Sequence, residues 1–171
     1  MYGNFCEFND LINIQNDNFI QNMTDFEPKA LICSVLTEVM EVCDCKPVFE
    51  AIDLPKSVVG DKDRLKYILA LLVKNSIKRN NQYYDLDLIN ISAHVSDNQE
   101  VDFDLSGFRD RTLVVNITDQ GGKIPNEKIK NVKEISTIKE IAKAMGGKLK
   151  IDSSGYDLTT FELSLPIQFP H

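Results

Sequence analysis

The sequence predicts an α+β protein, a two-layer sandwich in which helices cover one face of a single mixed sheet. Apolar periodicities of the helical and the alternating kind follow one another as helix, strand, helix, strand, strand, helix, strand, strand. Some neighbouring strands are joined by short connections and others by a whole helix, so antiparallel and parallel neighbours are both expected. The chain has 171 residues, 43% of them hydrophobic, which suffices for one domain with its own core.

The N-terminal part begins with the end of a helix and a connector. Apolar residues at helical spacing predict that residues 5–15 are the last turns of a helix, and the polar stretch 16–26 looks like a connector. A second helix is expected from Glu27, with Pro28 in its first turn, where a proline has no hydrogen bond to lose. That helix is expected to end before Pro47.

A short strand and the longest helix come next. Alternation predicts a strand over Val48–Ile52, and residues 61–79 (DKDRLKYILALLVKNSIKR) predict one amphipathic helix. Asp61 is suited to cap its start. Asn75 lies on the edge of the apolar stripe, where a polar amide needs a hydrogen-bond partner or a ligand. The apolar stripe consists of Leu65, Ile68, Leu69, Leu72, Val73, Ser76 and Ile77.

The second half alternates strands with one further helix. Strands are expected over 86–95, 113–118, 149–151 and 159–165, and a helix over 136–145 that ends at Gly146-Gly147. The polar stretch 96–111 reads as a loop, residues 126–132 as a short helical turn, and Pro166 as the end of the fold.

Composition narrows the classes of function. With 26 acidic and 19 basic residues, a net charge of −7 and a pI near 4.8, the chain lacks the basic footprint of a nucleic-acid partner. No apolar run is long enough to span a bilayer and no secretory signal is visible, so we expect no direct membrane contact and a cytoplasmic location, as a free protein or as part of a membrane receptor. Cys6, Cys33, Cys43 and Cys45 lack zinc-site spacing and are expected to be reduced thiols.

Four features in this order resemble a known family. They are Asn75 on a helix, Asp119-x-Gly121 at a strand end, a helix closed by Gly146-Gly147, and a final strand from Thr160 to Pro166. Together they resemble the ATP-binding domain of sensor histidine kinases, which has the Bergerat-type fold shared with gyrase and the mismatch-repair MutL proteins. The resemblance implies two parts: residues 1–25 as the end of an upstream dimerisation helix with its connector, and residues 26–171 as the ATP-binding domain.

The resemblance also implies roles for individual residues in binding ATP and Mg²⁺. Asn75 matches the magnesium-coordinating asparagine, and Lys78 matches a basic position that reaches phosphate, although a solvated surface lysine is the alternative. Asp119 matches the aspartate that accepts a hydrogen bond from the adenine amino group, with a plain turn residue as the alternative. Gly121 would let the backbone pass close to the base, and Thr160 matches a hydroxyl that supports the aspartate, or is simply a strand threonine.

Several positions depart from the family pattern. Lys123 replaces a glycine where backbone approaches the nucleotide, so it either touches phosphate or fills the site, and Leu71 replaces a polar residue. Residues 126–135 stand where the family has a long lid and a second glycine box, and they contain no glycine. Glu134 aligns with a glycine position, where its carboxylate would repel phosphate. Losing that cradle removes charge-assisted hydrogen bonds, roughly 1.5–3 kcal/mol each.

These departures predict a degenerate domain of a two-component, hybrid-type sensor kinase, with weak or absent ATP binding and a signalling or structural role. The alternatives are an active kinase domain that phosphorylates a histidine on an upstream helix, and a docking module of another class. Neither His94 nor His171 fits a phosphoacceptor position. The implied partners are the dimerisation and phosphoacceptor helices of the same protein, a response-regulator receiver domain, and a second copy in the longer protein.

Overall fold

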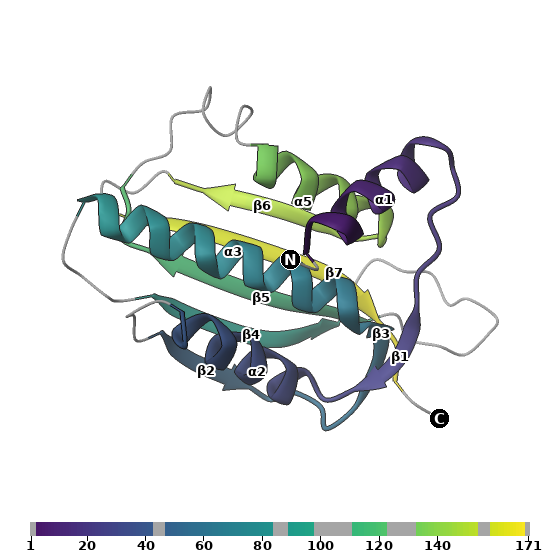
Figure 1. Ribbon diagram of the computed structural model, residues 1–171. Helices are drawn as coiled ribbons and strands as arrows, with labels where there is room; N and C mark the ends of the chain where they lie inside the picture. The colour runs from purple at the N-terminus through teal and green to yellow at the C-terminus, as the bar shows by residue number, and fades with distance from the viewer. Residues whose placement is uncertain are drawn as a thin grey trace.

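A five-stranded mixed sheet forms one layer of the molecule (Figure 1). The computed structural model describes residues 3–42, 47–83, 89–97, 111–122, 133–153 and 158–169. In spatial order the strands are β2 (Val48–Ile52), β4 (Asn90–Asp97), β5 (Arg111–Asp119), β7 (Thr159–Ile167) and β6 (Lys148–Asp152). The β2–β4 pair is parallel and the other pairs are antiparallel, which confirms the predicted mixed sheet.

The helices form the second layer. They are α1 (Gly3–Gln15), α2 (Pro28–Met40), α3 (Lys62–Tyr83) and α5 (Lys133–Ala144). Figure 1 shows α2, α3 and α5 over the same face of the sheet, with α1 lying against α5. Across the described ranges, no helix is both long and apolar enough to cross a membrane.

Strand alternation decides which side chains enter the core. In β5, Leu113, Val115 and Ile117 are buried beneath the helices, while Thr112 and Thr118 point to the open face. The buried face meets the apolar stripe of α3, in which Ile68 and Leu72 are fully buried and Leu65, Leu69, Val73 and Ile77 nearly so. One continuous core therefore fills the space between the sheet and the helices.

A second, two-stranded sheet was not predicted. β1 (Met23–Phe26) pairs antiparallel with β3 (Val58–Asp61), so the predicted connector over 16–26 contains a strand. The other edge of β3 meets the C-terminal end of the chain: Val59 N–H donates to the Gln168 carbonyl at 2.8 Å, and Gln168 N–H donates back at 3.1 Å. This small sheet joins the N-terminal connector to the body of the domain.

Several predicted element ends differ from the structure, among them the ends of α3 and β7. Helix α3 continues past Arg79 to Tyr83, because Asn80 is buried and its side-chain oxygen accepts a hydrogen bond from Gln120 N–H at 2.8 Å. Strand β7 continues through Pro166, which lies beyond the residues that β6 pairs, so its missing N–H costs no ladder hydrogen bond there. The predicted turn over 126–132 and most of the predicted loop over 96–111 lie outside the described residues.

Candidate functional site

Asp119, the last residue of β5, is the most deeply buried charged side chain of the candidate site. It lies two residues after Ile117 and therefore on the same, helix-covered face of the sheet. Its exposed fraction is 0%, and its strand partner across the ladder is Thr159, the first residue of β7. A buried carboxylate needs a counter-charge and hydrogen-bond donors, so its partners determine what this end of the sheet can do.

The counter-charge is Arg79 of α3. Its Nε lies 3.1 Å from Asp119 Oδ2 and 3.3 Å from Oδ1, and its Nη2 lies 3.3 Å from Oδ1. The same Nη2 donates to the Gly122 carbonyl at 2.6 Å and to Thr159 Oγ1 at 2.9 Å. The Arg79 side chain is only 15% exposed, so this is an inward-facing ion pair with most of its donors used.

The turn after β5 closes around this ion pair. Gly121 N–H donates to Asp119 Oδ1 at 2.9 Å, and Thr159 Oγ1 donates to the Gly122 carbonyl at 2.8 Å. A Cβ at Gly121 would lie 2.6 Å from the Cβ of Arg79, so only glycine allows the turn to approach α3 this closely. The Arg79 side chain thus packs directly against the turn backbone.

The structure brings only some of the predicted site residues to this place. Asn75 lies one turn before Arg79 on α3; it is half-buried, and its Nδ2 is buried with no hydrogen-bond partner among the described residues. Lys78 is exposed, and Lys123 lies outside the described residues. Thr160 is on the open face of the sheet, where its hydroxyl hydrogen-bonds that of Thr118 at 2.9 Å, away from Asp119.

Two residues of this site were not predicted from the sequence: Arg79, which contacts Asp119, and Thr159, which contacts Arg79 and Gly122. Thr159 shares the alternation of the buried Phe161 and Leu163, so strand periodicity alone could have assigned the inward-facing hydroxyl to Thr159 instead of its neighbour. Arg79 lies four residues after Asn75, and that spacing places both on one side of α3. No sequence pattern linked Arg79 to Asp119, which lies 40 positions later in the chain.

At the other end of the predicted nucleotide site, the described residues include little that would hold phosphate. Glu134 is exposed in the first turn of α5, where it presents a negative charge, and Leu71 is half-buried beside the core. In the part of the chain that the structure describes, no three His, Cys, Asp or Glu side chains are grouped to hold a metal ion.

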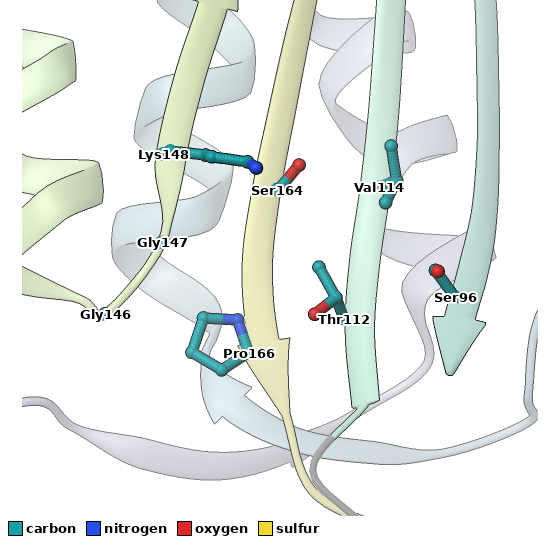
Figure 2. A pocket seen from close by; sticks show the side chains of 8 residues that line it. All are labelled: Ser96, Thr112, Val114, Gly146, Gly147, Lys148, Ser164 and Pro166. Atoms are coloured by element: carbon teal, nitrogen blue, oxygen red, sulfur yellow. The ribbon is translucent and has the colours of Figure 1, made fainter. Parts of the chain in front are cut away.

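A hollow also lies on the open face of the sheet (Figure 2). Figure 2 shows the Lys148 amine directed toward the Ser164 hydroxyl, with Pro166 nearby. The lining residues are Ser96, Thr112, Val114, Gly146, Gly147, Lys148, Ser164 and Pro166. This hollow is on the opposite side of the sheet from Asp119, and its lining contains no carboxylate, so it is separate from the ion pair.

Comparison with known proteins agrees with the fold described above. Residues 60–168 match the family described as histidine kinase-, DNA gyrase B-, and HSP90-like ATPase. The solved structure of the Acinetobacter baumannii histidine kinase AdeS is similar, with a TM-score of 0.70 and 18% sequence identity over 94% of this chain and 75% of that chain. No curated protein gave a significant sequence match.

Proposed function

Because this chain belongs to the histidine kinase-, DNA gyrase B- and HSP90-like ATPase family, we propose that it is a degenerate ATP-binding domain of a two-component sensor histidine kinase. The proposal has three parts. The domain keeps the family fold, its own Arg79 occupies the base-recognising end of the site, and it acts as a signalling or structural module with little or no affinity for ATP. Family members bind ATP, usually with Mg²⁺.

The ion pair between Arg79 and Asp119 carries this proposal. By resemblance, Asp119 is the acceptor for the adenine amino group, but its two oxygens already receive Arg79 Nε, Arg79 Nη2 and Gly121 N–H. A base would have to displace the guanidinium from a carboxylate that is 0% exposed. Breaking a buried ion pair costs about 3–5 kcal/mol, whereas one hydrogen bond to a charged group returns about 1.5–3 kcal/mol. The exchange is therefore unfavourable.

The surrounding geometry points the same way. Gly121 was expected to let the backbone pass close to a base, but the side chain of Arg79 packs against that glycine instead. Its contact with the Gly122 carbonyl further fixes the turn. The residues present therefore do not fit adenine while Arg79 holds this position.

At the phosphate and magnesium end of the site, some residues favour an anion and others oppose it. The unsatisfied group of Asn75 is its amide nitrogen, a donor that a phosphate oxygen would satisfy, while Mg²⁺ requires an oxygen ligand. Lys78 is exposed and free to reach an anion, but Glu134 adds a negative charge at the start of α5. These residues favour weak anion contact at most, and we derive no phosphoryl-transfer step through them.

The orphaned amide of Asn75 favours one other candidate function. In that candidate, the domain is an active kinase that binds Mg-ATP and phosphorylates a histidine on an upstream helix. Arg79 would then have to swing out of the base site when nucleotide enters. The degenerate domain would instead act through the proposed partners, namely the dimerisation and phosphoacceptor helices, a receiver domain and a second copy of the protein, in the cytoplasm.

Isothermal titration of the whole chain with a non-hydrolysable ATP analogue and Mg²⁺ distinguishes the two candidates. We expect no binding in the micromolar range for the wild-type protein, and the same for Lys78→Ala, a matched change at the neighbouring exposed residue. Micromolar binding by the wild-type protein would refute the degenerate assignment.

The Arg79→Ala variant tests whether the Arg79 side chain is what prevents the base from binding. Once the guanidinium is removed, adenosine should stabilise the folded variant, by about 1.4 kcal/mol at a concentration ten times its Kd. Adenosine should leave the wild-type protein unchanged. A thermal unfolding series measures both, after circular dichroism has shown that the variant is folded.

A further inference from the structure

Arg64, in the first turn of α3, makes contacts with three separate parts of the chain. Its Nε and Nη2 donate to the two oxygens of Asp10 in α1, at 3.0 and 2.8 Å. Its Nη1 donates to Asp61 at the end of β3 and, at 3.0 Å, to the Ile20 carbonyl of the connector. Its guanidinium also lies over the ring of Phe19, 4.4 Å from the centroid.

Asp61 extends this cluster. Its side chain accepts hydrogen bonds from Asn22 N–H at 3.0 Å and from the backbone N–H of Arg64 at 3.3 Å, the second of which caps α3. The side chains of Arg64, Asp10 and Asp61 are 16%, 7% and 1% exposed. The hydrogen bond that Arg64 donates to Asp10 is the largest cause that raises the pKa of Arg64, against the opposing effect of burial, so Arg64 remains charged.

Apolar packing over residues 9–15 of α1 is thin by comparison. Over residues 9–15 of α1, Asp10 is the single buried side chain; Leu11 and Ile14 are half-buried, and Ile12 is 37% exposed. A helix that packs through a continuous apolar stripe would bury several such residues. The attachment of α1 to the domain in this stretch therefore rests mainly on the charge cluster.

We propose that Arg64, Asp10 and Asp61 form an electrostatic latch that docks the N-terminal helix α1 on the domain, and that α1 leaves the domain as a unit when the latch is broken. The apolar stripe of α3 faces the sheet, and within residues 9–15 of α1 only the half-buried Ile14 packs against the core. Loss of Asp10 removes the bidentate contact but leaves Arg64 paired with Asp61. This inference concerns residues outside the candidate nucleotide site and is independent of the proposed function.

Hydrogen exchange of the whole chain, followed by mass spectrometry, tests the latch. In Asp10→Asn and Asp10→Ala, peptides from α1 should exchange on the order of 100-fold faster than in the wild type, as expected for a lost buried ion pair. Peptides from α3 and β5 should keep their wild-type protection. Lys66→Ala is the matched control, because it removes the ion pair of α3 with Glu38, whose side chains are 39% and 56% exposed; it should change neither region.

Two results would overturn the proposal. If α1 exchanges at the wild-type rate in both Asp10 variants, its docking does not depend on the charge cluster. If α1 and the core lose protection together and equally, the cluster supports the whole fold and α1 is not a separable unit. Faster exchange confined to α1 and the connector supports the latch.

Discussion

Removing either member of the Arg79–Asp119 ion pair should destabilise the folded domain even without any ligand. Asp119 is 0% exposed and Arg79 is 15% exposed, and their charged atoms approach to 3.1 Å. At an effective dielectric constant of 20, the direct attraction at this distance is about 5 kcal/mol, before the cost of desolvation. Removing one partner of a buried pair costs about 3–5 kcal/mol, because the other charge remains buried.

The two single substitutions should lower the free energy of unfolding by different amounts. Arg79→Met leaves a fully buried carboxylate whose one remaining donor among the described residues is the Gly121 N–H, so the free energy of unfolding should fall by about 5 kcal/mol. Asp119→Asn leaves a partly exposed guanidinium that keeps its contacts with Gly122 and Thr159. The free energy of unfolding should therefore fall by about 3 kcal/mol. The double variant Arg79→Met/Asp119→Asn leaves no charge at this site and should lose clearly less than the sum of the two single effects.

Urea unfolding at pH 7, followed by circular dichroism, measures these free energies for the wild type, both single variants and the double variant. The slope with denaturant should stay constant, so that midpoint shifts report stability. If both single variants lie within about 0.5 kcal/mol of the wild type, the pair is not a buried structural contact. If the double variant loses the sum of the two single effects, the side chains are not coupled.

Four further substitutions test the packing at two glycines, the turn after β5 and the control used above. Gly147→Ala should lower the free energy of unfolding by about 3 kcal/mol or more, because its Cβ would lie 2.2 Å from a β7 carbonyl oxygen. Gly60→Ala should lower it by about 1 kcal/mol, because its Cβ would lie 3.3 Å from an aromatic ring that can move. Similar unfolding midpoints for the two variants would contradict this difference. Thr159→Val should lose about 1–3 kcal/mol by urea unfolding, because its hydroxyl joins the turn after β5 to β7, and an unchanged midpoint would contradict that role. Lys66→Ala should change stability by no more than about 1 kcal/mol in thermal unfolding, and a larger drop would show that exposed pairs matter here.

The long periodic elements could be predicted from sequence because their patterns are local. The apolar stripe from Leu65 to Ile77 and the alternation from Leu113 to Ile117 each repeat often enough to identify a helix and a strand. Strands β1 and β3 have four residues each, and their partners are far apart in the chain, as with Met23 and Asp61. Only the tertiary pairing creates them, so no local pattern marks them.

The candidate site was predictable at Asp119 but not at Arg79. The Asp-x-Gly turn after an alternating strand has a local signature, and the burial of Asp119 follows from the same alternation. Arginine on a helix beside Lys78 is most often solvated, and its long side chain reaches several directions from one backbone position. That Arg79 turns inward depends on a carboxylate 40 positions later, which sequence spacing cannot place.

The small β1–β3 sheet has a practical consequence for dividing the chain. A fragment that began at Pro28 would keep β3 and its link to Gln168 but would lose the strand that covers the outer edge of β3. That edge would present unpaired N–H and C=O groups to solvent, and Val58 would lose the cover of Phe26, its strand partner. Exposed edges of this kind pair with other chains and aggregate. A well-behaved soluble fragment therefore has to begin at or before Met23.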